Sequence, residues 1–168
     1  MSALLTNIPV SEIMSVVVYP VSSDNTVSQA YGLMRGKHLG GLPVLENGRL
    51  VGVVTRADIK KVDLGKREKT KVKDIMSNKP VTVFSDDKVS TALEKMTKLR
   101  IGRMPVMSST GSLVGWLSLT DIERAVKILR YRKVGTPQGK NCPHCSAPLP
   151  ITISRTVTCQ HCGNTVNL

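Results

Sequence analysis

Residues 42–58 read LPVLENGRLVGVVTRAD, and residues 104–121 read MPVMSSTGSLVGWLSLTD. Both stretches contain a Pro-Val pair, a polar turn, a Leu-Val-Gly run, and then a hydroxyl residue with Asp three positions after it. The match extends toward the N-terminus, where VSEIMS at 10–15 corresponds to VKDIMS at 72–77. An internal repeat of about sixty residues indicates two copies of one folding unit.

Each copy is predicted to contain a strand, a helix, two strands and a second helix, in that order. In the first copy the β-branched run at 16–18 predicts the opening strand. Apolar residues three and four apart over 27–34 predict a helix, which we expect Gly40-Gly41 to end. Residues 42–45 and 50–54 are predicted to be strands, and the Asn-Gly pair between them favours a tight hairpin turn.

The closing helices are expected to begin at Thr55 and Ser118, and the second of them is longer. A unit of about sixty residues buries too little surface to be comfortably stable alone, so the copies should pack on one another as a pseudo-twofold pair. The predicted fold class is therefore α/β (α+β). We expect a first domain over 1–66, a second over 67–133, and a small β domain over 134–168.

The chain is strongly basic. Its formal net charge is +12, from 24 Lys and Arg against 12 Asp and Glu, and seven of the cations lie within residues 60–73. A surplus of this size favours contact with polyanions such as nucleic acid, although a solvated basic face has the same composition. No run of apolar residues is long enough to span a membrane, and the start of the chain lacks the features of a signal peptide. We therefore expect a cytoplasmic protein.

The repeated motifs resemble those of cystathionine β-synthase (CBS) domain pairs. The resemblance rests on the Ile-Met-Ser opening, the Pro-Val strand, and the Gly-x-x-Thr/Ser-x-x-Asp segment, each present twice and in order over about residues 8–130. It implies a regulatory protein, not an enzyme, that binds AMP, ADP, ATP or S-adenosylmethionine, and it implies a flat homodimer. The same pair is inserted in inosine-monophosphate dehydrogenase, whose catalytic barrel needs about 250 residues.

The paired hydroxyl and acidic residues are the predicted ligand site. A carboxylate can accept both hydroxyl hydrogens of a ribose, and a hydroxyl at the start of a helix suits a phosphate. The resemblance gives these roles to Thr55, Asp58, Ser118 and Asp121. It adds basic residues that contact phosphate, with Arg56 expected to favour phosphate at the first site: Arg56, His38, Arg100 and Arg103. The same Thr/Ser-x-x-Asp spacing is also a helix capping box, which needs no ligand.

Four cysteines close the chain as two Cys-x-x-Cys pairs, with thirteen residues between the inner cysteines. Two such pairs predict a closed tetrahedral metal site of the zinc-ribbon type, formed by Cys142, Cys145, Cys159 and Cys162. Iron in a rubredoxin-like centre is the alternative metal. Because about thirty residues without an aromatic side chain cannot form a core, metal binding should supply the folding free energy.

Two functions from different classes remain open at this point. The first is an adenosine-ligand sensor that presents the metal-binding domain to a protein partner. The second is a nucleic-acid-binding protein that uses the basic segment 60–73, the long helix after Ser118 and the metal-binding domain. No constellation of catalytic residues is evident in the sequence.

Overall fold

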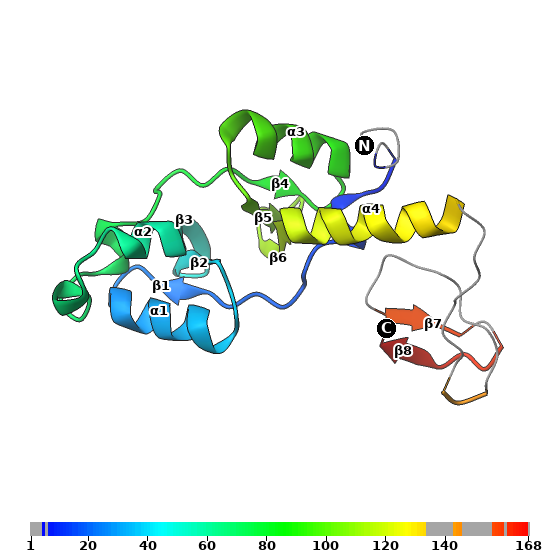
Figure 1. Cartoon of the computed structure of the whole chain (residues 1–168), viewed down its shortest axis with the longest axis horizontal. Coiled ribbons are helices and arrows are strands. Elements are labelled where there is room, and N and C mark those ends of the chain that lie inside the picture. Colours follow the sequence, from blue (N-terminus) through cyan, green and yellow to red (C-terminus); the bar gives the residue numbers. More distant parts are fainter. Residues whose placement is uncertain (1–4, 6, 134–142, 146–155, 160, 168) are drawn as a thin grey trace.

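The computed structural model describes residues 5, 7–133, 143–145, 156–159 and 161–167. Each repeat has the predicted order of elements (Figure 1). The first repeat consists of β1 (Val21–Ser22), α1 (Val27–Gly36), β2 (Gly41–Glu46), β3 (Arg49–Thr55) and α2 (Arg56–Lys60). The second consists of β4 (Val83–Phe84), α3 (Val89–Leu99), β5 (Arg103–Met107), β6 (Leu113–Ser118) and α4 (Leu119–Lys133). The mixed α+β fold of a duplicated unit is therefore confirmed.

The two sheets have the same topology. In each, a short first strand runs parallel to the middle strand, and the middle strand forms an antiparallel hairpin with the third, giving the orders β1-β2-β3 and β4-β5-β6. The hairpins place Val44 opposite Gly52 in one repeat and Val106 opposite Gly115 in the other. The equivalent registers show that the sequence repeat is also a structural repeat.

The prediction of a strand at 16–18 is wrong. Residues 16–18 have no regular structure, and the first strand is Val21–Ser22, after Pro20. Val16 and Val17 are 69% and 55% exposed, so these β-branched side chains are not part of a sheet core. The β-branched composition therefore identified an extended segment but not a paired one, because pairing depends on the neighbouring strand.

The helices α1 and α3 end earlier than the glycines suggest. His38 and Arg100, which correspond across the repeat, both adopt left-handed backbone conformations with φ of 54° and 53°. The next residue in each case, Leu39 or Ile101, donates its N–H to the carbonyl of a methionine five residues back, at 2.8 Å and 3.0 Å. This is the Schellman motif, in which the left-handed position is most often glycine. Gly40 lies two residues after His38, and it is packed against the guanidinium of Arg103.

The N-terminal segment of each repeat packs on the other repeat. Val10 and Ile13 lie in the core formed by the second repeat, whereas Val72 lies in the core formed by the first. The two N-terminal segments are thus exchanged between the repeats, and backbone hydrogen bonds hold them there. Val10 N donates to Asp87 O at 2.8 Å, and Val72 N donates to Asn25 O at 2.9 Å. The two hydrophobic cores are thus each built from both copies.

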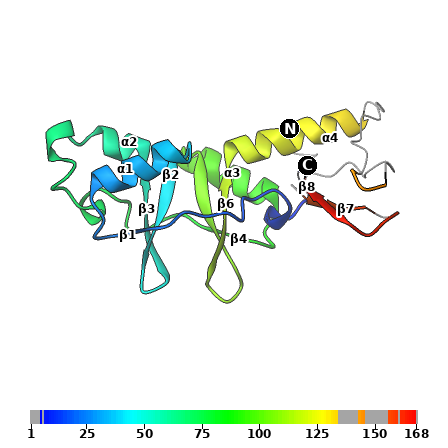
Figure 2. The ribbon, with the colours of Figure 1, turned by 90° about the horizontal axis from the view of Figure 1, so that it is seen from below.

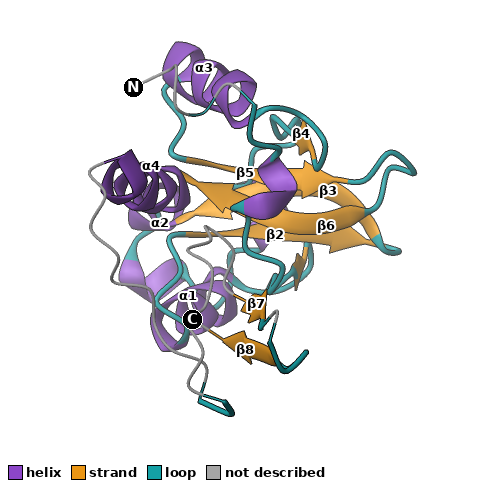
Figure 3. Ribbon diagram, turned by 90° about the vertical axis from the view of Figure 1, so that its right-hand side faces the viewer, coloured by secondary structure: helices purple, strands orange, loops and turns teal. Residues whose placement is uncertain are grey.

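The two β-hairpins stand next to each other and their turns extend to the same side, while the helices lie at the other end (Figure 2). Figure 3, viewed from the side, shows the helices gathered at one edge of the strands. The isolated bridges Ser15–Trp116 and Val53–Ser77 tie the entry segments to the third strands. Among the described residues, no helix is long and apolar enough to cross a membrane.

The C-terminal part contains a two-stranded antiparallel sheet of β7 (Thr156–Thr158) and β8 (Thr165–Asn167). Val157 pairs with Val166 across the sheet. Val157 and Cys159 are buried in a small cluster, and Cys145 and Val166 pack against it. Gly163 follows the second cysteine pair in a left-handed conformation with φ of 75°, as a tight turn requires. The small sheet agrees with the β domain expected at this end.

Candidate functional site

A cavity of about 350 Å³ lies between the two repeats. Its wall combines the irregular segment before β1, the end of the α1–β2 connection, and the start of β2 from the first repeat. The second repeat supplies the start of β5, the end of β6 and the first turns of α4. A cavity of this size falls within the range that accommodates small-molecule ligands.

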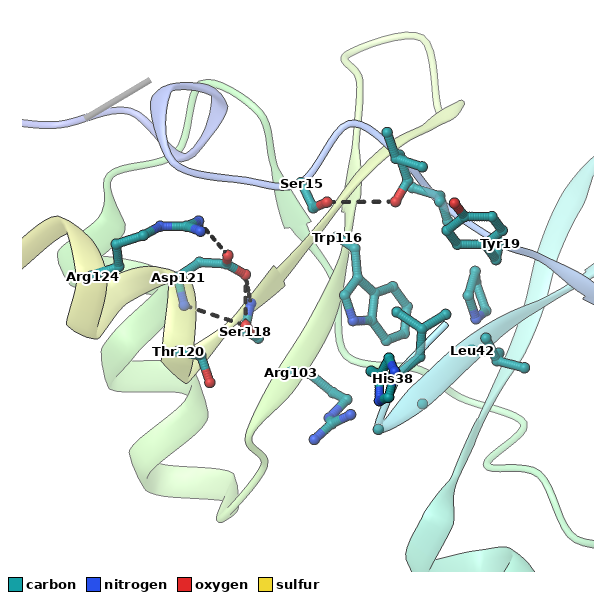
Figure 4. Close-up of a pocket in the computed structure, with 16 residues that line it drawn as sticks. Ser15, Tyr19, His38, Leu42, Arg103, Trp116, Ser118, Thr120, Asp121 and Arg124 are labelled. Carbon is teal, nitrogen blue, oxygen red and sulfur yellow. Dashed lines mark hydrogen bonds and ion pairs between the residues drawn. The ribbon is translucent and has the colours of Figure 1, made fainter. Parts of the chain in front are cut away.

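The polar end of the cavity is the junction between β6 and α4. Ser118 donates to one oxygen of Asp121 from its backbone N at 3.0 Å and from its Oγ at 2.6 Å, and Asp121 N donates back to Ser118 Oγ at 3.3 Å. The other carboxylate oxygen, Oδ1, accepts from Arg124 Nη2 at 2.7 Å. Asp121 is buried yet lines the cavity together with Ser118, Thr120 and Arg124 (Figure 4).

The junction between β3 and α2 in the first repeat has the same hydrogen bonds. Thr55 donates to Asp58 Oδ2 from its N at 3.0 Å and from its Oγ1 at 2.6 Å, and Asp58 N returns a bond to Thr55 Oγ1 at 3.3 Å. The capping interpretation of both motifs is therefore confirmed. The partner of the other carboxylate oxygen differs from that of Asp121. Lys61 Nζ lies 3.6 Å from Asp58 Oδ1, and the Lys61 side chain is mostly exposed. Thr55 and Asp58 are not part of the cavity wall.

The predicted basic residues separate into two groups. His38 and Arg103 line the cavity, whereas Arg56 and Arg100 do not. Arg56 instead donates from Nη2 to the carbonyl of Met34 at 3.1 Å. Of the eight residues predicted to bind the ligand, the structure thus brings together His38, Arg103, Ser118 and Asp121.

The sequence did not identify the apolar wall of the cavity. It is formed by Val17, Val18 and Tyr19 from the segment before β1, by Leu42, and by Trp116 of β6. Figure 4 shows Trp116, Tyr19 and Leu42 on the side away from Asp121 and Arg124. A signal was present in the repeat, since Trp116 stands where the first copy has Val53, but only the fold shows that this strand faces the cavity. Arg124 was likewise missed as a site residue.

The cations of residues 60–73 are partly engaged within the chain. Lys66 pairs with Asp63 at 3.2 Å, and Arg67 donates to the carbonyl of Val62 at 3.1 Å. Arg67 also lies over the ring of Tyr31, 5.1 Å from its centroid. The Lys66–Asp63 pair is exposed on both sides and the contacts of Arg67 are to neutral groups, so the segment keeps its positive charge.

Three of the four predicted metal ligands come together. The sulfur atoms of Cys145, Cys159 and Cys162 all lie within 4.8 Å of one another, and Cys145 Sγ is 3.6 Å from Cys159 Sγ. Zinc–sulfur bonds of about 2.3 Å in a tetrahedron place the sulfurs about 3.8 Å apart, so the cluster fits such an ion. Cys142 lies outside the described residues.

The backbone of the second Cys-x-x-Cys turn favours a thiolate at Cys159. Backbone N–H groups of Cys162 and His161 lower the pKa of Cys159 to about 6. Since the thiolate is the form that binds metal, this turn is suited to ligation at neutral pH. Asn164 Nδ2 also contacts Cys162 Sγ at 3.5 Å.

Comparison with known proteins agrees with this geometry. The family profile described as "CBS domain" matches residues 10–65 and 72–128. An inosine-5'-monophosphate dehydrogenase of Methanocaldococcus jannaschii is 37% identical over 107 residues, which are 62% of this chain and 21% of the relative. The chain thus spans about a fifth of that enzyme's length. An uncharacterized 17.7 kDa protein of Acidianus ambivalens is 30% identical over 143 residues, 81% of this chain and 87% of the relative.

Solved structures with the same fold include two complexes. The CBS domain pair of protein MJ0100, in complex with 5-methylthioadenosine and S-adenosylmethionine, superimposes with a TM-score of 0.65 at 26% identity and covers 71% of this chain and 96% of its own. CBSX2 in complex with AMP superimposes with a TM-score of 0.66 at 26% identity, and the match covers 73% of this chain and 98% of CBSX2. The CBS domain protein TA0289 of Thermoplasma acidophilum shares the fold over 95% of this chain and 99% of its own, with a TM-score of 0.65 at 23% identity.

The profile match covers both copies of the repeat and more than half of the chain, and each copy has the matching order of strands and helices. The chain therefore belongs to the CBS domain family.

Proposed function

We propose that this protein is a non-enzymatic regulator that binds an adenosine-bearing ligand in the cavity between its two repeats. The observation that carries the proposal is the placement of Asp121 at the polar end of a cavity whose opposite wall contains Trp116 and Tyr19. A nucleoside has the complementary arrangement, with a diol at one end and a flat base at the other. The complexes of related pairs with S-adenosylmethionine and with AMP support the same class of ligand.

The proposed pose follows from the hydrogen bonds. Ser118 occupies Asp121 Oδ2 with two donors, which leaves the ribose diol to approach the carboxylate at Oδ1, beside Arg124. The base then extends toward Trp116 and Tyr19, where aromatic faces favour stacking. Val17 and Val18, which are not part of a sheet core, close the apolar wall.

Thr55, Arg56, Asp58 and Arg100 are proposed to form a second, separate site at the first repeat. Thr55, Asp58 and Arg100 correspond across the repeat to Ser118, Asp121 and His38, which line the cavity, and Thr55 and Asp58 make the same hydrogen bonds as Ser118 and Asp121. Because Trp116 lines only the cavity at Asp121, signals from the two sites can be separated.

The C-terminal domain is proposed to hold one structural metal ion through Cys142, Cys145, Cys159 and Cys162. The three sulfur atoms lie close enough together to form one face of a tetrahedral site, which supports this assignment. Zinc is the preferred ion and iron the alternative; when bound, the ion would cross-link the two Cys-x-x-Cys turns. Elemental analysis of the purified protein decides between them, and iron would also give visible thiolate-to-metal absorbance.

The remaining elements of the proposal concern partners. We expect a homodimer, a protein partner that responds to ligand, and a cytoplasmic location. The related complexes favour the adenosine ligand over the nucleic-acid alternative.

Thermal unfolding tests the proposal. At a ligand concentration of 100 times Kd, binding to the folded state adds about 2.7 kcal/mol, which raises the melting temperature by several degrees. AMP, ADP, ATP and S-adenosylmethionine are each added at millimolar concentration, and at least one should produce this rise. Asp121→Asn should remove the part of the rise that comes from the cavity, and the matched variant Asp74→Asn, which alters a carboxylate cap outside both proposed sites, should retain the full rise. The absence of a rise with all four compounds would refute the proposal.

A further inference from the structure

Two arginine side chains lie over the ring of Tyr31, on the surface of the first repeat. The guanidinium carbon of Arg67 is 5.1 Å from the centroid of the Tyr31 ring, and that of Arg35 is 6.0 Å from it. Arg67 is held further by its Nε, which donates to Val62 O at 3.1 Å. An aromatic ring positions a guanidinium without neutralising its charge, because the ring itself is uncharged.

The cations around Tyr31 keep their charge. Among the residues that the structure describes, neither Arg35 nor Arg67 forms an ion pair with an acid. The turn that carries Arg67 adds Lys66 and Lys69, which are exposed. Lys66 pairs with an acid on the surface, where such pairs contribute little. We call the five residues Tyr31, Arg35, Lys66, Arg67 and Lys69 the Tyr31 surface.

Backbone hydrogen bonds fix the turn to the first residues of α1. Val27 N donates to Thr70 O at 3.0 Å, and Ser28 N donates to Arg67 O at 3.1 Å. These bonds satisfy N–H groups that have no partner within the helix itself. Figure 1 shows the turn after α2 beside α1, at the end of the paired repeats away from α4. The cations of the turn are therefore held beside Tyr31 by the fold.

The second repeat shows that the fold does not require this arrangement. Leu93 occupies the position of Tyr31 and Leu5 that of Arg67, both at an offset of 62 residues. Leu5 is fully buried in the core of that repeat, and Leu93 packs against the same core. The segment equivalent to the basic turn lies within residues 1–11, which contain no Lys or Arg. An apolar pair thus suffices at this place, and the aromatic and cationic residues of the first repeat need another explanation.

The residue types on the Tyr31 surface match the parts of a nucleic acid strand. Guanidinium planes and aromatic rings stack on bases, whereas arginine and lysine contact phosphates. Base faces are accessible in a single strand and covered in a duplex. An acidic peptide would satisfy the charge but offer no flat groups to the guanidinium planes. The observations therefore favour a single strand.

We propose that the Tyr31 surface binds single-stranded nucleic acid, in addition to the adenosine ligand proposed for the cavity. None of its five residues lines the cavity, so the two activities are separate. The four cations contact phosphates of the strand, and the guanidinium planes of Arg35 and Arg67 stack on its bases.

Fluorescence anisotropy of a labelled oligothymidylate of about 12 nucleotides, titrated with the full chain, tests the proposal. Binding should be saturable at about 50 mM salt and weaken as salt is raised to about 200 mM. The slope of log K against log salt should be about −3, because each of four phosphate contacts on a single strand contributes about −0.7. A duplex of the same length should bind at least about fivefold more weakly.

Three variants locate the binding surface. Arg67→Leu and Tyr31→Leu introduce the residue type that the second repeat has at each position, and each should weaken oligonucleotide binding about tenfold. Arg67→Leu should also make the salt slope about 0.7 less steep, whereas Tyr31→Leu should leave the slope unchanged. Lys69→Gln changes an exposed side chain without risk to the core, and it should lower the slope by the same amount.

Arg49→Leu is the matched control for Arg67→Leu, because Arg49 is an exposed arginine in the β2–β3 hairpin, away from the helices (Figure 2). Its oligonucleotide affinity should stay within about twofold of the wild type, since distant charges are screened by salt. The absence of binding at about 50 mM salt, equal losses in Arg49→Leu and Arg67→Leu, or equally tight binding of the duplex would each overturn the proposal. Displacement of the oligonucleotide by polyglutamate at equal charge would also overturn it and indicate an acidic protein partner instead.

Discussion

At the scale of single residues, His38 combines an unfavourable backbone conformation with a place in the cavity wall. Its φ of 54° lies in the left-handed region, where a side chain costs about 1–2 kcal/mol relative to glycine. The Schellman motif around it would form equally well with glycine. Strained residues that persist at a cavity often serve a ligand, and Arg100 has the same conformation at the equivalent position.

His38→Gly is therefore expected to stabilise the fold and to weaken the site. Relief of the left-handed conformation should raise the free energy of unfolding by about 1 kcal/mol in denaturant titration. AMP affinity should fall severalfold, because a wall residue of the cavity is removed.

Asn47→Gly supplies the comparison for His38→Gly. Asn47 has a φ of 49° in the β2–β3 turn, outside the cavity wall. Because Asn tolerates the left-handed conformation, Asn47→Gly should gain less stability than His38→Gly and leave AMP affinity unchanged. If His38→Gly were to lose no affinity, His38 would have only a structural place in the helix end.

Several residues of the site were predictable from sequence because they recur. Ser118 and Asp121 were found through their match to Thr55 and Asp58, and the structure confirms the cap that both pairs form. Which of the two pairs lines the cavity was not predictable, because the hydrogen bonds are alike in the two repeats. It depends on Trp116, Tyr19 and Arg103, which reach the cavity from segments distant in the sequence.

At the scale of elements, the exchange of N-terminal segments is the main feature that the repeat did not reveal. Periodicity identifies Val10 and Val72 as equivalent residues, yet it does not tell which of two equivalent cores each one enters. The structure places Val10 in the core with Val83, Val89 and Met96, and Val72 in the core with Val27 and Met34.

The exchange predicts a crossed pattern of local destabilisation. Val10 and Val72 are both fully buried, so Val10→Ala and Val72→Ala should each lower the free energy of unfolding by about 1–3 kcal/mol. Amide hydrogen exchange should show that Val10→Ala reduces protection mainly in residues 83–126, and that Val72→Ala does so mainly in residues 21–59. Loss of protection in the repeat to which each valine belongs by sequence would contradict the exchange.

At the scale of the whole molecule, we propose that two parts depend on different sources of stability. The paired repeats share two aliphatic cores, whereas the buried cluster described in the C-terminal part consists of Val157 and Cys159 with Cys145 and Val166 against it. Composition and cysteine spacing predict that a bound metal ion stabilises this part, and that remains a prediction.

Removal of the metal should accordingly unfold one part and spare the other. A strong chelator is expected to abolish the protection of amides in residues 156–159 and 161–167, and to leave the melting temperature of the paired repeats within about 2 °C of its original value. Zinc added back should restore the protection. If these amides were equally protected with and without chelator, the proposed structural metal would be wrong.

The most direct measurement of the central claim is a fluorescence titration with AMP. Trp116 is the only tryptophan in the sequence, and it lines the proposed site. The emission of Trp116 should change saturably as AMP fills the cavity, the change should be lost in Asp121→Asn, and it should remain in Asp58→Asn. Emission that does not respond to AMP, or that responds equally in Asp121→Asn, would contradict the placement of the ligand between Asp121 and Trp116.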